Sequence, residues 1–386
     1  MGIAHRSFAG LLLAALALAT LPQCRRIEPR PTAPQGGTTQ TLSRDECRAV
    51  LRDDTDPATI LPAAERSLDY YRRIPEDRAL PVLNRTVPAR DLRGVIESLV
   101  ARPPSTDTAS LCDRFTLARV VSALPMLITG YYEPELAARR QRGGRFRYPL
   151  YAVPDDLVEV DLAKYCPTCA GKHAIGRVVN GELAPYFSRA EIDTGVIDSQ
   201  TSVIAWLDDP VEAFFVHVQG SAQLRFDDGV HMHVGYNGSN GRPYTSIGKV
   251  LVDAGKLAPD QVSLATLKDY LRAHADERDA ILERNERYIF FRTVPAGPVG
   301  SLTVPLTAGR SVAADAHFYA PGALIFLKTT ASADTPAISR LALIQDAGAA
   351  ISGDNRLDLF CGSGETAGAI AGTMRAPGEL YILLPQ

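Results

Sequence analysis

The sequence predicts a mainly β protein of two domains, in which short strands form small barrels rather than one doubly wound sheet. Short apolar runs separated by Gly, Pro and Asn recur at irregular spacing from Met126 to the end of the chain. The chain beyond its first 43 residues is too long for one ordinary hydrophobic core. It contains no tandem repeat and no heptad pattern, which excludes solenoids and coiled coils.

The first residues have the pattern of a secretory signal. A short region with one arginine leads into an uninterrupted apolar stretch from Phe8 to Ala19. This stretch is shorter than the about 20 apolar residues that a membrane-spanning helix needs. We therefore predict a signal peptide over residues 1–23 and export of the mature protein.

The segment after this signal leaves open how the exported protein is held. Cleavage after Ala19 would release it, whereas cleavage before Cys24 would leave a lipid-modified cysteine that tethers it to a membrane. Gln23 stands where a lipoprotein site has a small residue, so both outcomes stay open. Residues 24–43 are rich in Pro, Thr and Gly and lack apolar periodicity, which predicts a flexible tether.

Apolar periodicity assigns the segments that follow. Apolar residues recur at helical spacing in some segments, and alternating or continuous apolar runs bounded by Gly, Pro and Asn predict strands in others. The predicted helices are Arg44–Tyr71, Arg90–Ala101, Ser246–Ala254, Leu264–Glu277 and Glu365–Met374. The predicted strands are Leu127–Tyr132, Tyr148–Val153, Val203–Leu207, Ala213–Gln219, His231–Tyr236, Tyr288–Arg292, Leu324–Leu327, Leu341–Gln345, Leu357–Phe360 and Tyr381–Leu384.

Charge and cysteine spacing argue against several functions. The formal net charge is −3, and no basic stripe with interleaved aromatics indicates nucleic-acid binding, although a locally basic groove could hold an anionic polymer. Cys166, Cys169 and His173 lack a fourth zinc ligand and the strand-to-helix context of a redox motif, so we predict a small disulfide. A second disulfide between Cys47 and Cys112 is compatible with export. We predict no metal and no cofactor.

The last ninety residues contain the candidate catalytic group. In the run from Leu357 to Phe360, the two leucines occupy one face of a strand, and Asp358 shares the other face with the aromatic ring. A carboxyl group against apolar surface has a raised pKa, which a general acid needs at neutral pH. Asp346 ends the preceding strand, where a carboxylate is costly unless it is hydrogen-bonded. Asp354 fits ordinary turn chemistry.

These residues carry a resemblance to a known family. The segments QDAGAAISG (345–353) and RLDLFCGSGETA (356–367) resemble the C-terminal three-aspartate module of the membrane-bound lytic murein transglycosylase A family. Further segments match the family in order: TGYYEP (129–134), YPLY (148–151), VQGSA (218–222), GYNG (235–238) and PLTAGRS (305–311) with Ala314 and Asp315. The similarity extends over about residues 120 to 386.

The resemblance implies a fold and a set of site residues. The expected fold is a double-psi β-barrel formed by residues 44–133 and 292–386, with the three-aspartate module at about 300–386. An inserted β-rich domain over 134–291 completes a groove, and the few helices are mostly N-terminal. Asp358 is the expected catalytic residue. The expected supporting residues are Asp346 and Asp315, and the expected substrate-binding residues are Gln219, Ser221, Thr129 and Tyr131.

The resemblance also implies an activity. The expected enzyme cleaves the β-1,4 bond between N-acetylmuramic acid and N-acetylglucosamine in peptidoglycan and forms 1,6-anhydromuramoyl ends without water or a cofactor. It would act on glycan strands in the periplasm, either anchored to the outer membrane through Cys24 or free, as a monomer that does not bind nucleic acid. Two alternatives stay open: a hydrolytic glycosidase with Asp346 or Glu365 as second carboxyl group, and a non-catalytic wall-binding protein.

Overall fold

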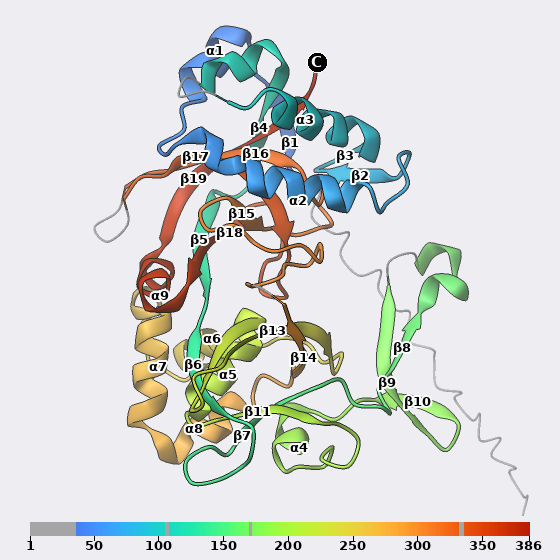
Figure 1. Ribbon diagram of the computed structural model, residues 1–386, viewed down its shortest axis with the longest axis vertical. Coiled ribbons are helices and arrows are strands. Elements are labelled where there is room, and N and C mark those ends of the chain that lie inside the picture. Colours follow the sequence, from blue (N-terminus) through green and yellow to red (C-terminus); the bar gives the residue numbers. More distant parts are fainter. Residues whose placement is uncertain (1–35, 105–107, 170–171, 296, 332–335) are drawn as a thin grey trace, which may run out of the picture. The chain divides into compact units, whose positions relative to one another are not determined.

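Both ends of the described chain contribute strands to one eight-stranded sheet (Figure 1). The computed structural model describes residues 36–104, 108–169, 172–295, 297–331 and 336–386. The predicted signal peptide over 1–23, the first part of the predicted tether and Cys24 lie outside these ranges. No helix within them is long and apolar enough to cross a membrane.

The large sheet closes into a barrel. Its strand order is β1-β4-β19-β16-β17-β15-β18-β5, and β5 also pairs with β19, so that the six strands from β19 to β5 form a ring. The strands are β1 (Thr38–Thr41), β4 (Phe115–Val121), β5 (Met126–Glu133), β15 (Ser311–Ala313), β16 (Leu324–Thr329), β17 (Ser339–Asp346), β18 (Arg356–Ser363) and β19 (Arg375–Pro385). The predicted mainly β fold with a barrel is confirmed, whereas the double-psi crossover stays a prediction.

The predicted flexible tether over 24–43 is wrong at its end. Thr38–Thr41 forms β1, which pairs antiparallel with residues 118–121 of β4. Ser43 caps the next helix by accepting a hydrogen bond from the backbone of Glu46. A strand at a sheet edge gains its main-chain hydrogen bonds without an apolar pattern, so composition alone did not reveal it.

Three helices precede the barrel strands: α1 (Arg44–Val50), α2 (Leu61–Tyr71) and α3 (Ala89–Ala101). The last of them confirms the predicted helix at Arg90–Ala101, but the single helix predicted over Arg44–Tyr71 is wrong in its middle. There Asp53 leaves the helical path and forms an ion pair with the buried guanidinium of Arg310, at 2.6 Å. A buried charge is costly unless it is paired, and this pair accounts for the break.

Two disulfides are present. Cys47 and Cys112 join α1 to the segment before β4, and Cys166 and Cys169 close the predicted small loop. Their sulfur atoms are therefore not free to bind zinc. Across the described residues, no group of three or more His, Cys, Asp and Glu side chains is arranged to hold a metal ion.

The segment between β5 and β15 forms its own sheets. The larger has the order β14-β13-β12-β6-β11-β7, and a smaller one has the order β10-β9-β8. The strands are β6 (Glu135–Arg139), β7 (Tyr148–Tyr151), β8 (Val158–Asp161), β9 (His173–Val179), β10 (Glu182–Pro185), β11 (Val203–Leu207), β12 (Ser221–Phe226), β13 (His231–Ser239) and β14 (Ile289–Val294). Apolar clusters around Leu224 and Tyr288 are separate from the barrel core around Phe326. They support the predicted insert over 134–291, whose boundaries stay a prediction.

One predicted strand of this insert is a helix. Ala213–Gln219 belongs to α5 (Pro210–Gln219), because Asp209 accepts hydrogen bonds from the first turn and Pro210 occupies its start. Gly220 ends the helix with a φ of 82°, a conformation that favours glycine. Six of the ten residues of α5 are buried and the other four are half-buried, so its apolar run lacked the periodicity that separates a helix from a buried strand.

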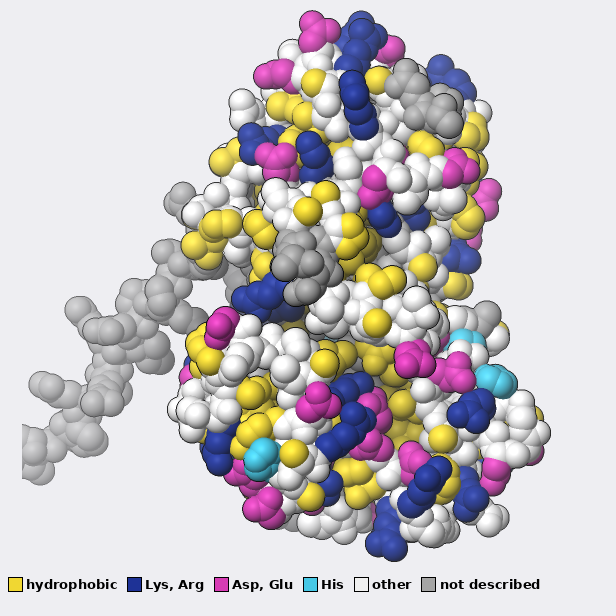
Figure 2. Space-filling model, turned by 90° about the vertical axis from the view of Figure 1, so that its left-hand side faces the viewer, with side chains coloured by type: hydrophobic (Ala, Val, Ile, Leu, Met, Phe, Trp, Pro, Cys, Tyr) yellow, Lys and Arg dark blue, Asp and Glu magenta, His cyan; other side chains and the backbone are white. Residues whose placement is uncertain are grey.

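The other helices are spread along the chain: α4 (Arg189–Asp193), α6 (Ile247–Asp253), α7 (Leu264–Ala273), α8 (Ala275–Leu282) and α9 (Gly364–Thr373). A two-stranded hairpin of β2 (Ala79–Val82) and β3 (Arg85–Pro88) lies between α2 and α3 in the sequence. Because α4 to α8 belong to the insert, the helices are not mostly N-terminal as expected. Figure 2 looks at the side of the molecule on which α7 and α9 lie. Charged side chains of both signs are mixed over that face.

Candidate active site

Strand β18 places Asp358 on the outer face of the barrel. Its neighbours Leu357 and Leu359 are 0% and 2% exposed and belong to the barrel core. The alternation of a strand therefore turns Asp358 away from the core, and its side chain is 15% exposed. Register pairs Asp358 with Thr129 of β5 on one side and with Ala313 of β15 on the other.

The carboxyl group of Asp358 is buried with little compensation. Its Oδ1 atom accepts no hydrogen bond from the described residues, and the nearest cation is the Arg356 guanidinium, at 3.7 Å. Burial raises the pKa of Asp358 to about 6; the charge of Arg356 lowers it, and that of Asp346 raises it further. At pH 7 about a tenth of this carboxyl group is therefore protonated, against less than a thousandth for a carboxyl group with a pKa of 3.8. A raised pKa is what the sequence predicted for a general acid.

Asp346, at the end of β17, has the opposite surroundings. Its Oδ1 atom accepts hydrogen bonds from the backbone of Ser301 and Ala347, both at 2.9 Å. Its Oδ2 atom accepts a hydrogen bond from the hydroxyl of Tyr131, also at 2.9 Å. Burial raises the pKa of Asp346 even though these three hydrogen bonds favour its ionised form. Asp346 thus connects a loop, its own strand and β5 next to Asp358.

Asp315, which follows β15, ties a second loop to the strand of Asp358. Its Oδ1 atom accepts hydrogen bonds from the backbone and ring of His317, and its Oδ2 atom accepts one from the backbone of Gly353, at 2.9 Å. Gly353 has a φ of 91°, which favours glycine at this turn before β18. Burial opposes ionisation of Asp315, but these hydrogen bonds outweigh it and lower its pKa.

The two predicted substrate-binding residues of β5 lie beside the acid. Thr129 is the cross-strand neighbour of Asp358, and its hydroxyl approaches the carbonyl oxygen of Leu357 at 3.4 Å. Tyr131 donates its hydroxyl to Asp346, and its ring lies 5.4 Å from that of Phe360. This hydrogen bond makes Tyr131 a support for Asp346, while a role in binding substrate stays a prediction for both residues.

The other two predicted substrate-binding residues belong to the insert. Gln219 is the last residue of α5, and Ser221 begins β12, where it pairs with Gly235 of β13. No hydrogen bond joins either side chain to Asp358 within the described residues. Their contact with a glycan therefore stays a prediction.

One residue near the acid, Tyr244, had no signal in the sequence, and Glu133, which lies in the TGYYEP segment, has a connecting role that the sequence did not predict. Burial raises the pKa of Tyr244, and the charges of Arg356 and Asp358 both act on its hydroxyl, so this loop of the insert lies near the acid. Glu133, at the end of β5, is fully buried and accepts hydrogen bonds from His233 of β13, at 3.2 Å, and from Ser363, at 2.8 Å. Glu133 thus links the barrel to the insert.

Ser363 is the N-cap residue of α9, but its side chain makes no capping hydrogen bond and binds Glu133 instead.

A pocket of about 640 Å³ lies between α7 and α9, with Tyr132 in its lining. Tyr132 also packs against α9, whereas its neighbour Tyr131 contacts Asp346, so this pocket and the acid lie on opposite faces of β5. The predicted groove at Asp358 stays a prediction.

Comparison with known proteins assigns the chain to a family. Residues 127–292 match the family model of the MltA specific insert domain, and residues 310–384 match that of the 3D domain. The crystal structure of a membrane-bound lytic murein transglycosylase from Agrobacterium tumefaciens is 32% identical, with a TM-score of 0.79 over 90% of this chain and 98% of that one. The chain belongs to the membrane-bound lytic murein transglycosylase A family. The resemblance seen in the sequence is confirmed.

Other members of the family agree. MltA from Neisseria gonorrhoeae is 29% identical, with a TM-score of 0.72 over 92% of this chain and 94% of that one. The membrane-bound lytic murein transglycosylase A of Vibrio cholerae is 32% identical over 273 residues. That match spans 67% of this chain and 65% of the Vibrio cholerae protein, slightly less than two thirds of its length.

Proposed function

We propose that this protein is a lytic transglycosylase that cleaves the β-1,4 bond between N-acetylmuramic acid and N-acetylglucosamine in peptidoglycan. The observation that carries the proposal is the buried carboxyl group of Asp358, whose pKa is raised to about 6 and whose Oδ1 atom accepts no hydrogen bond from the described residues. The names of the relatives from Agrobacterium tumefaciens and Vibrio cholerae describe the same activity.

In the proposed mechanism Asp358 acts first as acid and then as base. The protonated carboxyl group donates its proton to the glycosidic oxygen, and the bond between that oxygen and C1 of N-acetylmuramic acid breaks. The carboxylate then takes the proton of the C6 hydroxyl of the same sugar while that oxygen bonds to C1. Because this nucleophile is already attached to the reacting ring, its effective concentration is high and no water is needed.

The surroundings of Asp346 favour this reaction over hydrolysis. A hydrolytic glycosidase needs a second carboxylate free to act on water or on C1. Both oxygen atoms of Asp346 already accept hydrogen bonds, three in all, and Glu365 is exposed at the start of α9. We assign Asp346 and Asp315 to positioning: each joins a loop to a strand of the barrel near Asp358.

We further propose that the protein acts in the cell envelope, in the periplasm, on the basis of the family name and the signal sequence. Its polymeric partner would be the glycan strand of peptidoglycan. We also propose that Cys24 tethers the protein to the outer membrane and that the protein is a monomer. Labelling cells with a radioactive fatty acid tests the tether, since a Cys24→Ser variant would lose any label that the wild-type protein carries.

Product analysis tests the reaction itself. Purified sacculi are digested with the protein, and the soluble fragments are analysed by mass spectrometry. We expect 1,6-anhydromuramoyl ends, which are lighter than reducing ends by one water. Reducing ends alone would show hydrolysis, and glycan binding without any soluble fragment would show a wall-binding protein.

A further inference from the structure

The connection between β6 and β7 is strongly basic. Residues 139–147 (RRQRGGRFR) contain five arginines and no acidic residue, on a chain whose formal net charge is −3. The catalytic proposal leaves this segment without a role. A local concentration of guanidinium groups on a mildly acidic protein creates a positive potential that attracts anionic ligands.

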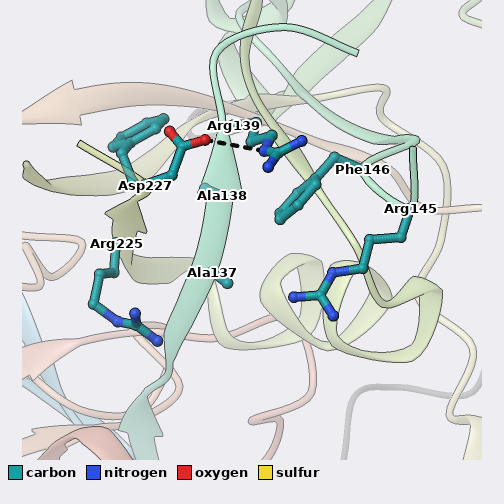
Figure 3. A pocket seen from close by; sticks show the side chains of 8 residues that line it. Ala137, Ala138, Arg139, Arg145, Phe146, Arg225 and Asp227 are labelled. Atoms are coloured by element: carbon teal, nitrogen blue, oxygen red, sulfur yellow. Dashed lines mark ion pairs between the residues drawn. The ribbon is translucent and has the colours of Figure 1, made fainter. Parts of the chain in front are cut away.

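Three arginines surround a pocket of about 400 Å³ beside this segment (Figure 3). Arg145 and Arg225 extend on either side of Ala137, and Arg139 lies above them in this view, where it forms an ion pair with Asp227. Because the floor consists of Ala137 and its neighbouring alanine, no large side chain fills the space between the guanidinium groups. The pocket therefore suits a small, negatively charged group.

Aromatic contacts limit the freedom of two of these guanidinium groups. Arg139 and Arg145 lie 4.7 Å and 5.4 Å from the ring centre of Phe146, which is buried. Such contacts hold the planar guanidinium in place while its N–H groups stay available to acceptors. A guanidinium held in this way loses less conformational freedom when it binds a carboxylate.

The acidic partners of the pocket arginines do not block it. Arg139 pairs with Asp227 at 3.1 Å, Arg145 with Asp208 at 3.0 Å, and Arg225 with Glu135 at 3.3 Å. The arginine side chains are 46%, 72% and 56% exposed. Exposed ion pairs of this kind stabilise a protein little, so a ligand carboxylate can compete for the guanidinium groups.

The pocket lies on the same face of the insert sheet as Ser221. Alternate residues of β12 point to one face, so that Arg225 and Ser221 share it, whereas the intervening Ala222 and Leu224 pack in the apolar cluster with Val216 of α5. Arg225 is four residues from Ser221, or about 13 Å along a strand. A strand bound at Ser221 would thus have the pocket within reach of a short side branch.

We propose that this arginine pocket binds the carboxylates of the peptide branches that peptidoglycan carries on its N-acetylmuramic acid residues. The inference rests on the proposed function and extends it to the part of the substrate recognised away from the cleaved bond. A branch of four residues spans up to about 13 Å when extended, which matches the separation along β12. Guanidinium groups bind carboxylates through paired hydrogen bonds, and more than one carboxylate can be held.

The pocket is better suited to such a branch than to a membrane surface. An amphipathic basic segment that inserts into a membrane carries exposed large apolar side chains that enter the lipid. The aromatic residues in the lining, Phe146 and Phe226, are 7% and 3% exposed and belong to the interior. The experiment must distinguish a peptide branch from anionic lipid as the ligand of the pocket.

The test compares two substrates with one pair of variants of the full chain. The substrates are glycan strands with their peptides and the same strands after removal of the peptides by an amidase. The pocket variant is Arg145→Gln with Arg225→Gln. The matched control is Arg48→Gln with Arg119→Gln, two arginines that are 47% and 45% exposed in ion pairs outside the insert.

For the pocket variant we expect the KM for peptide-bearing strands to rise about tenfold, a size within the usual range for the loss of two exposed charge pairs. Its kcat, its Tm and its KM for stripped strands should stay unchanged, and the control variant should equal the wild type on both substrates. Equal KM values for pocket variant and wild type on peptide-bearing strands would overturn the proposal. So would a rise of the same size on both substrates, which would indicate recognition of the sugar.

Two further measurements keep the outcomes distinct. If only binding to phosphatidylglycerol vesicles falls in the pocket variant, the pocket contacts lipid and the proposal is wrong. If the wild type releases no anhydro ends from either substrate, the proposed function fails. Calorimetric titration with the free tetrapeptide then still tests the pocket, since the pocket variant should bind this peptide about tenfold more weakly than the wild type and the control.

Discussion

The end of β17 and the middle of β18 each carry a buried carboxyl group, but the surroundings of the two groups differ. Asp346 and Asp358 are both buried carboxyl groups on the barrel, and burial raises the pKa of each. Asp346 accepts three hydrogen bonds, whereas the Oδ1 atom of Asp358 accepts none from the described residues. The hydrogen bonds thus lie on Asp346, the proposed positioning residue, whereas the Oδ1 atom of Asp358, the proposed proton donor, has none from the described residues.

The largest effect should follow from Asp358→Asn. This change keeps the shape of the side chain but removes the proton donor, and general acid–base catalysis contributes about 10²- to 10⁴-fold in rate. We expect the release of anhydro ends from sacculi to fall by at least that factor. Near-normal turnover would show that the acid lies elsewhere, and Glu133 would then be the next residue to replace.

The same variant should be more stable than the wild type. The pKa of Asp358 is raised from 3.8 to about 6 in the folded protein, so folding favours the neutral form. The ionised form therefore destabilises the fold at pH values above 6 by about 2–3 kcal/mol, and this cost disappears as the pH falls below about 4. Asn removes it, and a Tm that rises at pH 8 but not at pH 4 is expected. A lower Tm at pH 8 would contradict the surroundings described for this group.

Asp346→Ala should have the opposite effect on stability. It removes the acceptor for two exposed backbone N–H groups and for the hydroxyl of Tyr131. This hydroxyl is the buried donor of the three, and an unsatisfied buried donor costs about 1–3 kcal/mol. We expect a lower Tm together with an activity loss of about tenfold or more. Asp346→Asn is the control, because its remaining oxygen can still accept both backbone hydrogen bonds. An equal loss of Tm in both variants would contradict this assignment.

The pH dependence of kcat/KM should shift in opposite directions for two further changes. Activity needs protonated Asp358, so it should decline as the pH rises through about 6. Arg356 lowers the pKa of Asp358 and Asp346 raises it. Arg356→Gln should therefore move this decline to higher pH, and Asp346→Asn should move it to lower pH. Shifts in the same direction, or no shift, would show that a group other than Asp358 causes the decline.

The smallest effect is expected for Asp354→Asn. The carboxylate of Asp354 accepts a hydrogen bond from the backbone of Gly37 beside β1, and an amide oxygen can accept the same bond. Activity and Tm should both stay close to those of the wild type. A large loss of activity with an unchanged Tm would move the catalytic role from β18 to the turn before it.

The sequence revealed the parts of the site that leave a local pattern. Asp358 was found because it interrupts an apolar alternation, and the strand alternation is confirmed by the buried leucines beside it. The contacts of Asp346 and Asp315 with Ser301, Tyr131 and Gly353 join residues that are 38 to 215 positions apart, so spacing could not show them. Tyr244 approaches the acid from an insert loop whose sequence has neither periodicity nor a recognised spacing.

Other elements were missed because the pattern sought was too narrow. The helix α5 is buried on nearly all sides, so its apolar run resembled a strand, although Asp209, Pro210 and Gly220 were present as signals for its ends. The sequence does not show the arginines of 139–147 as a basic stripe with interleaved aromatics, because the rings that they contact come partly from residues far away in the chain. Arg140 and Arg142 contact Phe226 and Trp206 in this way.

The closed ring of strands has a consequence for how the chain reaches its native state. Strand β5 pairs with β18 and β19, which follow it in the sequence by more than 220 residues. Such pairings form slowly, because the chain loses the conformational entropy of a long loop before any contact stabilises it. The strands of the insert can pair while β5 still lacks its partners. The barrel, and with it the surroundings of Asp358, can therefore be complete only once β19 is available to pair. Under the proposed export, the chain would not act on the wall while it is still being secreted.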